Sequence, residues 1–349
     1  MDFQLSDDQR ALRSGMRDLL GAVFDRDRLR AAVERGGALD RSLWRELGAA
    51  GFFALRLPEE AGGVGLGLPE AVLLFEEAGR ALLPGPLVAT HLAAGLVKGA
   101  AEGEEVVTAV AGDLAVAHLA EADAVLVVGA EPPAGEATGA ESLTGEALRA
   151  FVAAARPVRS MDPLTPLHSA RAVAERAPAA TERTPAHAGR FRFEAALLTA
   201  AEQLGSAART TEAAVQHAGS REQFGSPVGA FQAVKHLCAD MLARTEPARA
   251  AVYAAAVTGD PVEIAAAKLL ADEAAVRNAR DCLQIHGGMG FTWEADVHLH
   301  LKRAWLRAAS WLTGAGTEEL LAADLGAAGR LPRSSAAPGR PVREAGGGG

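Results

Sequence analysis

The hydrophobic pattern of the first hundred residues is that of amphipathic helices. Apolar residues recur three and four positions apart after Ser6 and Gln9. These two residues form a capping-box pattern, because each side chain can satisfy the free backbone N–H of the other residue. Asp40 is placed to cap a second helix, and Pro69 suits the first turn of a third. We therefore predict an N-terminal α-helical domain over residues 1–100.

A different pattern follows, in which short β-capable runs alternate with turn-rich stretches. Residues 106–110 read Val-Val-Thr-Ala-Val, and residues 124–128 read Ala-Val-Leu-Val-Val, with Glu-Pro-Pro-Ala-Gly soon after the second run. Runs of β-branched residues bounded by Pro and Gly are typical of strands joined by turns. The pattern predicts a small β-domain over residues 101–190.

Helical periodicity returns in the last third of the chain. Apolar residues mark one face over residues 204–218 and another over residues 231–242. Asp260 is followed by Pro-Val-Glu, which combines an N-cap residue, a proline in the first turn and an acidic residue at a helix start. We expect Pro247 to kink or interrupt the preceding helix, because proline lacks an N–H and clashes with the previous turn. These patterns predict a C-terminal helical bundle over residues 191–328.

The complete pattern predicts a mostly α-helical protein with a small β-domain (α+β). Residues 329–349 are rich in Gly, Pro and Ser, which predicts a disordered tail. The chain has 349 residues, of which 49% are hydrophobic. This apolar fraction is enough to build a large core.

The charge of the chain narrows the possible functions. Its 35 basic and 44 acidic residues give a net charge of −9, which argues against a general nucleic-acid binder and against a polybasic membrane-surface protein. The sequence contains no run of about 18 apolar residues, the length that a bilayer span requires. The first residues, Met-Asp-Phe-Gln, lack the pattern of a signal peptide. We expect a soluble cytoplasmic protein that binds neither nucleic acid nor membrane.

No metal site is predicted. The chain has two cysteines, Cys238 and Cys282, which are too few for a disulfide scaffold or a zinc cluster. Cys238 belongs to an apolar helical face, which indicates a core position. His298 and His300 are two positions apart, so they point in different directions on a helix, and no third ligand is evident in the sequence.

Two segments carry candidate ligand-binding chemistry. Residues 220–229 read Ser-Arg-Glu-Gln-Phe-Gly-Ser-Pro-Val-Gly, and residues 284–292 read Gln-Ile-His-Gly-Gly-Met-Gly-Phe-Thr. Neither has the Gly-x-Gly-x-x-Gly pattern after a strand that a Rossmann dinucleotide site requires. An arginine suits a pyrophosphate, and a Gly-Gly pair lets the backbone approach a ligand closely. Each also has a structural interpretation, with Arg221 favoured by a helix C-terminal dipole and Gly287-Gly288 serving as a helix cap.

These two segments, in this order, resemble the acyl-CoA dehydrogenase family. The loop Pro58-Glu59-Glu60 and residues 161–167, which read Met-Asp-Pro-Leu-Thr-Pro-Leu, resemble it as well, so the resemblance covers roughly residues 1–325. It implies FAD bound between an α-helical N-terminal domain, a middle β-domain and a C-terminal four-helix bundle, usually in a tetramer. It also implies that two hydrogens are removed from the α and β carbons of an acyl-CoA thioester, with electrons passed to an electron-transfer flavoprotein.

The resemblance implies which residues bind the cofactor. Arg221 matches the family's arginine that contacts the FAD pyrophosphate of a neighbouring subunit, and Phe224 matches its flavin-contacting neighbour. The segment that starts at Gln284 matches the one that contacts the adenosine side of the same shared cofactor. Gln232 lies in the helix that often approaches this region. The implied cofactor-binding residues are Arg221, Phe224, Gln232, Gln284, Gly287 and Gly288.

The catalytic base of the family has no clear counterpart in this sequence. In most members a glutamate takes the α-proton, and the matching position here is Ala315. An alternative base position of the family falls on Ala195, with Glu194 one residue away. A shift of one residue turns a helical side chain by about 100°. Glu194 is therefore a candidate base, and the alternative interpretation is an acidic residue favoured by a helix N-terminus.

The middle region departs from the family as well. The segment Thr-Glu-Pro-x-Ala-Gly-Ser has no counterpart between residues 100 and 190, and the β-domain looks shortened. The chain thus resembles the short, base-lacking subunits of heteromeric actinobacterial acyl-CoA dehydrogenases, which are α2β2 heterotetramers with a base-bearing homologous subunit. Two alternatives stay open, namely a complete homo-oligomeric dehydrogenase that uses Glu194 and a non-enzymatic helical scaffold.

Overall fold

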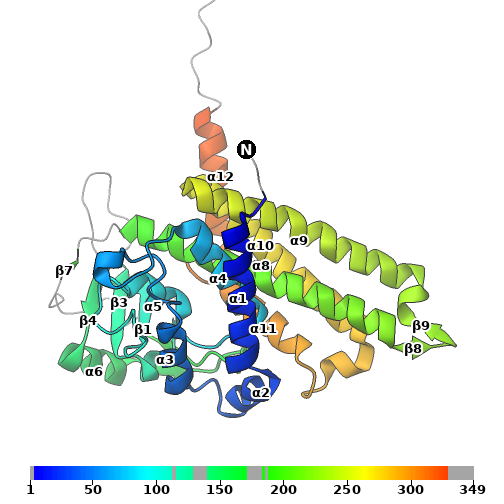
Figure 1. Cartoon of the computed structure of the whole chain (residues 1–349), viewed down its shortest axis with the longest axis horizontal. Coiled ribbons are helices and arrows are strands. Elements are labelled where there is room, and N and C mark those ends of the chain that lie inside the picture. Colours follow the sequence, from blue (N-terminus) through cyan, green and yellow to red (C-terminus); the bar gives the residue numbers. More distant parts are fainter. Residues whose placement is uncertain (1–3, 112–114, 129–139, 171–182, 185–187, 329–349) are drawn as a thin grey trace, which may run out of the picture.

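Long helices dominate the chain, and short strands form a small part beside them (Figure 1). This arrangement confirms the predicted fold class. The computed structural model describes five stretches of the chain, which are residues 4–111, 115–128, 140–170, 183–184 and 188–328. The predicted disordered tail, residues 329–349, lies outside the described residues.

The N-terminal helices begin where their capping residues predict. The elements of this part are α1 (Asp7–Val23), α2 (Arg26–Glu34), α3 (Arg41–Ala49), η1 (Glu59–Ala61), α4 (Leu68–Arg80) and α5 (Leu87–Ala93). The hydroxyl of Ser6 accepts the N–H of Gln9 at 3.1 Å, and the Gln9 side chain accepts the N–H of Ser6 at 3.1 Å, which completes the capping box of α1. Asp40 accepts the N–H of Ser42 at 2.9 Å and so caps α3.

Two small sheets fill the middle of the chain. Their elements are β1 (Val107–Ala111), β2 (Val116–Ala117), η2 (Leu119–Glu121), β3 (Ala124–Val128), β4 (Ala140–Leu143), α6 (Gly145–Ala154), β5 (Arg156–Val158), β6 (Leu167–Ser169) and β7 (Arg183–Thr184). One sheet has the order β1-β3-β4-β7, with β1 and β3 parallel and the other neighbours antiparallel. The other has the antiparallel order β2-β6-β5. The two predicted runs form β1 and β3, whereas helix α6, which buries Leu148 and Phe151, was not predicted.

The C-terminal part is a bundle of long helices. Its elements are α8 (Ala188–Ser220), β8 (Glu222–Gln223), β9 (Ser226–Pro227), η3 (Val228–Ala230), α9 (Gln232–Thr258), α10 (Pro261–His286), η4 (Gly287–Phe291), α11 (Val297–Ala308) and α12 (Gly314–Ala328). Helix α10 packs against α8, α9, α11 and α12, and α4 of the N-terminal part packs against α8. Asp260 caps α10 by accepting the N–H groups of Val262 and Glu263. None of the described helices combines the length and the apolar character that a bilayer span requires.

Of the two effects predicted for Pro247, a kink or an interruption, the interruption does not occur, because α9 continues through this residue to Thr258. A proline inside a helix costs about 3 kcal/mol through its missing hydrogen bond and its ring contact with the previous turn. Tertiary packing offsets this cost here, since Met241, Ala248 and Val252 around Pro247 are all fully buried in the bundle. Burial of these neighbouring residues in the bundle therefore keeps α9 helical at Pro247.

One hydrophobic core joins the three parts of the chain. It contains Trp44 and Phe75 from the N-terminal helices, Val107 from β1 and Ile264 from α10. The predicted limits of the three domains stay a prediction, because a single core runs through all of them.

Two glycines let α4 and α8 cross with their backbones in contact. A Cβ on Gly205 of α8 would lie 1.8 Å from the carbonyl oxygen of Glu76, and a Cβ on Gly79 of α4 would lie 2.0 Å from the carbonyl oxygen of Glu202. Both distances are far shorter than a van der Waals contact. Only glycine fits at these two positions, because it alone has no Cβ.

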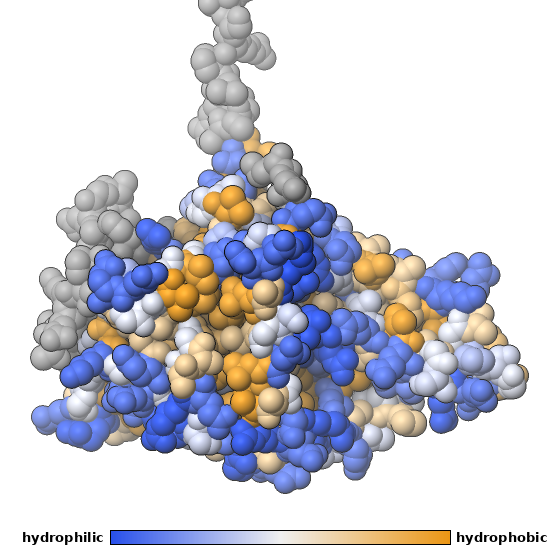
Figure 2. Space-filling model, in the orientation of Figure 1, coloured by the Kyte–Doolittle hydropathy of each residue, from blue (hydrophilic) through white to orange (hydrophobic). Residues whose placement is uncertain are grey.

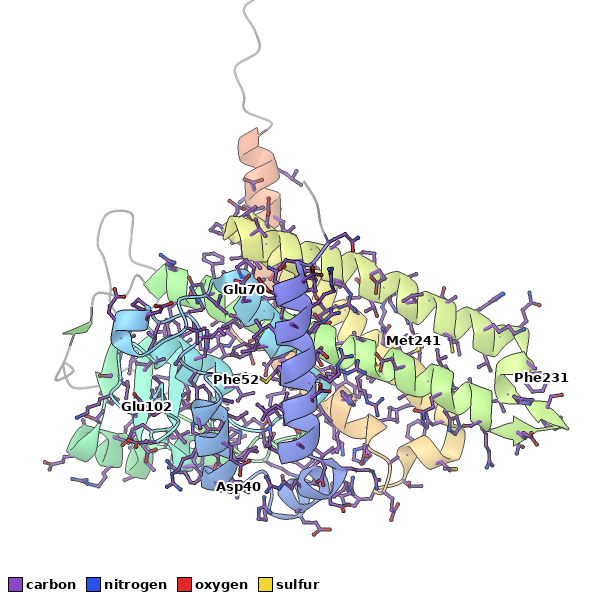
Figure 3. The ribbon with its side chains drawn as sticks, in the orientation of Figure 1. Asp40, Phe52, Glu70, Glu102, Phe231 and Met241 are labelled. Carbon is purple, nitrogen blue, oxygen red and sulfur yellow. The ribbon has the colours of Figure 1, made fainter. Side chains whose placement is uncertain are left out.

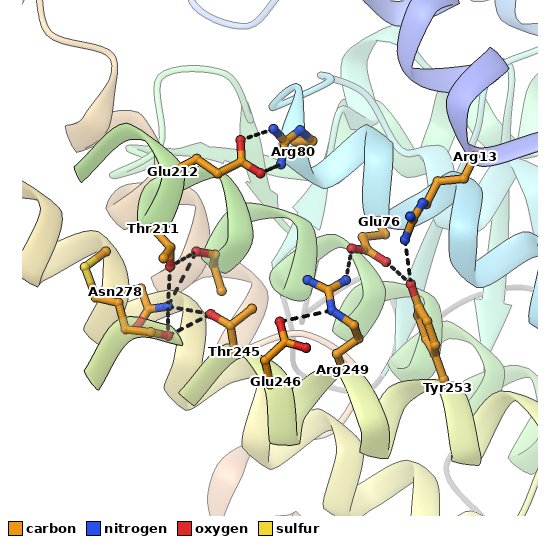
Figure 4. A network of polar contacts seen from close by, with 12 residues as sticks. Arg13, Glu76, Arg80, Thr211, Glu212, Thr245, Glu246, Arg249, Tyr253 and Asn278 are labelled. Atoms are coloured by element: carbon orange, nitrogen blue, oxygen red, sulfur yellow. Dashed lines mark hydrogen bonds and ion pairs between the residues drawn. The ribbon is translucent and has the colours of Figure 1, made fainter. Parts of the chain in front are cut away.

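Buried carboxylates at this crossing bind cations from two other helices. Glu76 accepts a hydrogen bond of 2.6 Å from the Tyr253 hydroxyl and forms an ion pair with Arg249, both on α9 (Figure 4). Glu77 accepts two hydrogen bonds, of 2.7 and 2.8 Å, from Arg17 on α1. Charge-assisted pairs of this kind fix the orientation of the helices that carry them.

A second buried polar centre joins α8, α9 and α10. The amide nitrogen of Asn278, a fully buried residue, donates to the hydroxyls of Thr211 at 3.1 Å and Thr245 at 2.9 Å (Figure 4). Its amide oxygen accepts a hydrogen bond of 2.9 Å from Arg244. Because a buried amide must find partners for its polar atoms, this residue fixes the register of the three helices.

Two histidines are buried in uncharged form. His300 Nδ1 lies 2.7 Å from the hydroxyl of Ser206, and burial lowers the pKa of His300 to about 3. His91 Nδ1 lies 3.1 Å from the carbonyl oxygen of Phe52, and burial lowers the pKa of His91 to about 4. In both cases the protonated ring would lose its hydration without gaining an acidic partner.

Substitution of Gly205 by alanine tests the helix crossing. The new Cβ would collide with the backbone of Glu76, so we expect Gly205→Ala to lower the free energy of unfolding by about 3 kcal/mol in urea denaturation. Gly219→Ala on the same helix is the control, because a Cβ there has no atom within 4 Å. This control should raise stability by up to about 1 kcal/mol through its higher helix propensity. Equal stability of the two variants would contradict the close crossing.

The buried histidines predict a loss of stability on mild acidification. A histidine with a pKa of about 3 or 4 when folded and 6.5 when unfolded takes up a proton on unfolding below pH 6.5. Stability therefore falls as the pH falls, by about 1 kcal/mol for each histidine between pH 7.5 and 5.5. Urea denaturation measured across this pH range should show that the stability of His300→Gln depends less on pH than that of the wild type. If the free energy of unfolding of the wild type did not change over this pH range, the assignment of His91 and His300 as uncharged in the folded protein would be wrong.

Candidate functional site

The first predicted cofactor contacts lie in a short hairpin at one end of the helical bundle (Figure 1). Arg221 connects α8 to the β8–β9 hairpin, and its N–H donates to the carbonyl oxygen of His217 at 2.8 Å. Its own carbonyl oxygen accepts the N–H of Val228 at 2.7 Å. Phe224 at the hairpin turn has a φ of 55°, and its ring, which is 93% exposed, meets the Phe231 ring edge-on. The hairpin thus has an exposed cation at its start and an exposed aromatic ring at its turn, three positions apart.

The remaining predicted contacts lie next to this hairpin. Gln284 is exposed in the last turn of α10, and Gly287, with a φ of 61°, ends that helix. The rings of His217 and His286 stack with their centroids 4.1 Å apart, which brings the ends of α8 and α10 together. A Cβ on Gly287 or Gly288 would meet no atom within 4 Å, so the backbone is open to a ligand there. Gln232 begins α9 directly after η3, which packs against α8, and completes the cluster. The structure therefore places all six residues that the sequence implied at the same end of the bundle.

The surface at this end is unusually apolar. Exposed fractions are 42% for Phe231, 55% for Met289 and 72% for Phe291, in addition to the exposed Phe224. Figure 2 shows apolar residues among polar ones at the end of the molecule that carries the hairpin. Exposed apolar side chains that cluster in this way mark an interaction surface.

The hairpin end lies far from the sheets. Glu194 and Arg221 are 27 positions apart along the continuous helix α8. At a rise of about 1.5 Å per residue, this separation is about 40 Å. Figure 3 shows Phe231 at the hairpin end and Glu102 beside the sheets at the other end. Arg221 therefore cannot share a ligand with Glu194 within one chain unless that ligand spans the whole bundle.

Glu194 forms ion pairs with two arginines, so its carboxylate is not an unpaired proton acceptor. It lines an open cavity of about 370 Å³ and accepts hydrogen bonds of 2.8 Å from both Arg56 and Arg190. Burial raises the pKa of Glu194, but the hydrogen bonds and charges of the two arginines outweigh burial and hold the pKa below its usual value. A carboxylate with a lowered pKa is a weaker proton acceptor. Ala315, the second residue of α12, has no carboxylate to act as a base. Glu318 and Glu319, which follow it in the same helix, are exposed.

A second cavity, which sequence reasoning missed, lies between the sheets and the bundle. It has a volume of about 230 Å³ and is bounded by α5, β1, β6, α8 and α11. Most of its walls are apolar, but Glu202 of α8 and the pair Arg303 and Arg307 of α11 also line it. The two arginines are four positions apart, which puts them on one face of a helix. This spacing is the feature of the sequence from which their common face could have been predicted. It does not reveal that the face is buried.

The segment 161–167 anchors this cavity. Asp162 is buried and pairs with Arg303, and it also accepts a hydrogen bond of 2.6 Å from the Thr165 hydroxyl. Burial raises the pKa of Asp162, but the charge of Arg303 and the hydrogen bonds outweigh burial and lower it. Glu202 accepts a hydrogen bond of 2.6 Å from Arg307. Burial raises the pKa of Glu202 against the opposing charge of Arg307.

The residues weighed as metal ligands serve other contacts. His298 stacks on the Trp293 ring, and its Nε2 lies 3.3 Å from the carbonyl oxygen of Trp293. His300 pairs with Ser206 on a different helix. Cys238 is half-buried and packs against a second, smaller apolar cluster in the bundle, which includes Met241 and Cys282. Within the described ranges, no three His, Cys, Asp or Glu side chains form a group that could hold a metal ion.

Comparison with known proteins identifies relatives over most of the chain. The sequence pattern of the acyl-CoA dehydrogenase N-terminal domain matches residues 6–104, and that of the C-terminal domain matches residues 189–329. The acyl-CoA dehydrogenase IpdE2 of Mycobacterium tuberculosis is 37% identical over 307 residues, which are 85% of this chain and 91% of that protein. The acyl-CoA dehydrogenase FadE34 of the same organism is 37% identical over 330 residues, and the match spans 46% of its length.

Solved structures share the fold. The ChsE4-ChsE5 complex from Mycobacterium tuberculosis matches with a TM-score of 0.78 and 22% identity, over 95% of this chain and 100% of that chain. PigA with FAD and proline matches with a TM-score of 0.79 and 19% identity, over 93% of this chain and 99% of that chain. The chain therefore belongs to the acyl-CoA dehydrogenase family, which confirms the predicted family, its class of oxidoreductase and its cofactor, FAD.

Proposed function

We propose that this chain is the base-lacking subunit of a heteromeric acyl-CoA dehydrogenase that desaturates the α,β bond of an acyl-CoA thioester. In this proposal a homologous partner chain carries the base, and an electron-transfer flavoprotein accepts the electrons. When bound, FAD supplies the acceptor for the hydride that leaves the β-carbon. The residues of this chain contribute binding and orientation.

The observation that carries this proposal is the separation along α8. Arg221, directly after the last residue of α8, lies about 40 Å from Glu194 near the start of the same helix. A cofactor held by Arg221 would therefore meet a substrate cavity of another chain. One of the solved structures whose fold this chain shares is that of the ChsE4-ChsE5 complex.

The residues at the hairpin end suit a dinucleotide. Among the described residues, Arg221 has no ion-pair partner, so its guanidinium is free for a pyrophosphate. The exposed ring of Phe224 offers a planar apolar face, and the open backbone at Gly287 and Gly288 admits a ligand closely. Gln284 and Gln232 add side-chain amides, each able to donate and accept hydrogen bonds.

The exposed apolar residues support a partner chain. Besides those at the hairpin end, Leu242 and Val257 on α9 are 53% and 65% exposed. Together they extend the apolar surface along the outer helix of the bundle. Such a surface is costly in water, and burial against a homologous chain would remove that cost.

One observation favours a second candidate function, a complete dehydrogenase with its own base. Glu202 lines the cavity between the sheets and the bundle, and burial raises its pKa. A raised pKa suits a general base near neutral pH. Its pairing with Arg307 opposes this role, since the arginine stabilises the ionised carboxylate.

Removal of Arg221 tests the cofactor site. We expect Arg221→Ala, in the complex purified with its partner chain, to weaken FAD retention about tenfold or more, because charge-assisted hydrogen bonds to phosphate are lost. Flavin absorbance per complex after dialysis measures the effect. Arg277→Ala is the control, since Arg277 is also exposed but pairs with Glu273 on its own helix. Full retention of FAD by Arg221→Ala would reject the shared site.

Two carboxylate variants test the absence of a base in this chain. The proposal expects Glu194→Gln and Glu202→Gln to keep the turnover of the assembled enzyme within about threefold, with an unchanged flavin spectrum. Loss of a true general base would cost about 10²-fold or more. Such a loss for Glu202→Gln would establish the second candidate function, and a loss for Glu194→Gln would restore the sequence-based candidate.

A further inference from the structure

The segment that joins α10 to α11 carries open glycines in its first half. Gly287 and Gly288 begin it, and a Cβ at either position would meet no atom within 4 Å. In the same half, Met289 is 55% exposed and Phe291 is 72% exposed. A glycine-rich backbone can adopt many conformations, because glycine is the least restricted residue. The conformation of this half therefore depends on the contacts that the rest of the chain makes with the segment.

Two arginines of α2, which lies beside this segment, contact its second half (Figure 1). Arg30 donates through Nη2 to the carbonyl oxygen of Trp293 at 2.6 Å. Arg26 donates through Nη2 to the carbonyl oxygen of Glu294 at 2.8 Å and through Nε to Asp296 at 2.6 Å. Nη1 of Arg30 lies 3.4 Å from the other carboxylate oxygen of Asp296. Both arginines reach the same short stretch, because residues four positions apart lie on one face of a helix.

The ring of Trp293 connects this stretch to α11 as well. Lys302 Nζ lies 4.9 Å from the ring centroid, and the guanidinium carbon of Arg30 lies 5.8 Å from it. The His298 ring stacks on the indole with the centroids 5.2 Å apart. An indole attracts cations even where it is partly exposed to water. Residues 293–296 are therefore held between a helix of the N-terminal part and a helix of the bundle.

Thr292 connects the held stretch to the glycine-rich half. Its N–H and its hydroxyl both donate to the carbonyl oxygen of Met289, at 3.1 and 3.0 Å. Its own carbonyl oxygen accepts the N–H of Ala295 at 3.3 Å. Thr292 is thus bonded to η4 on one side and to the stretch that α2 contacts on the other. A displacement of residues 293–296 would be transmitted to η4 through these hydrogen bonds.

The contacts of the two arginines suit the ordering of a segment better than the stabilisation of the whole fold. The side chain of Arg26 is 62% exposed and that of Arg30 is 17% exposed. Ion pairs near the surface contribute little to global stability, because water screens them. Several contacts on one short stretch do restrict its backbone. A segment that is already ordered binds a ligand more tightly, because it loses less conformational entropy on binding.

We propose that Arg26 and Arg30 are positioning residues of the FAD site, which hold residues 293–296 and thereby fix the glycine-rich half in the conformation that binds the cofactor. This inference rests on the proposed function, since it takes FAD as the ligand at this end of the bundle. The two arginines do not touch the cofactor in this proposal. They act on it through the segment, although Arg26 and Asp296 are 270 positions apart in the sequence.

Hydrogen exchange in the full-length chain, before FAD is added, tests the contact itself. We expect Arg26→Ala/Arg30→Ala to speed amide exchange in residues 287–296 about tenfold or more and to leave the rest of the bundle unchanged. Arg28→Ala/Arg35→Ala is the matched control, because it removes two exposed arginines of α2 and its C-terminal cap. This control should exchange as the wild type does. Unchanged exchange in the first variant overturns the inference, and so does faster exchange throughout the chain, which would indicate a general structural role.

The rate of FAD release from the complex with the partner chain tests the effect on the site. Arg26→Ala/Arg30→Ala should release FAD about tenfold faster than the wild type. Saturating FAD should restore wild-type turnover, since neither arginine takes part in the chemistry. Arg26→Lys/Arg30→Lys keeps both charges but loses the forked donors, so it should also release FAD faster. Release at the wild-type rate by either variant overturns the inference.

Arg221→Ala in the same assay separates this inference from the proposed function. If Arg221→Ala releases FAD and the α2 variants retain it, the shared site stands and the positioning role is rejected. If only the α2 variants release FAD, the positioning role stands and the role of Arg221 is rejected. If all of the variants retain FAD, both are rejected.

Discussion

The contact between the backbones of α4 and α8 is the constraint on which the rest of the structure depends. Gly79 and Gly205 face each other's helices with no space for a side chain. The residues beside them, Glu76, Glu77 and Glu202, are forced into the interior and must be paired there. Their partners come from α9, α1 and α11 respectively. A single close crossing thus determines where three other elements of the chain have their charged contacts, because a buried carboxylate without a partner is strongly unfavourable.

The same crossing fixes α8 as a rigid axis with different chemistry at its two ends. The end beside the sheets carries Glu194 and reaches the cavities, while the other end carries Arg221 and leads into the exposed hairpin. The distance between them is far greater than the reach of any side chain. The end that carries Arg221 also exposes apolar side chains, among them Phe224 and Phe291.

The interior of the bundle is rich in charge, and the charges are distributed in balanced pairs. The pairs are Lys268 with Asp272, Arg307 with Glu202, and Arg303 with Asp162, and the last two pairs contribute side chains to the cavity between the sheets and the bundle. Such pairs contribute little net stability, because desolvation offsets most of their attraction. Their effect is to fix the positions of the charged side chains that line the cavity.

The sequence by itself determined what depends on neighbouring residues. Ser6, Asp40 and Asp260 predicted the starts of three helices, because a cap acts within one turn. The segments around Arg221 and Gln284 predicted the family, although the sequence could not show that both lie at the same end of the bundle. Tertiary structure alone decided the course of α9 through Pro247 and the burial of Arg303 and Arg307, which as sequence are indistinguishable from surface charges. Asp162 and Arg303 are 141 positions apart, and only folding brings such a pair together, because burial depends on partners that no local pattern specifies.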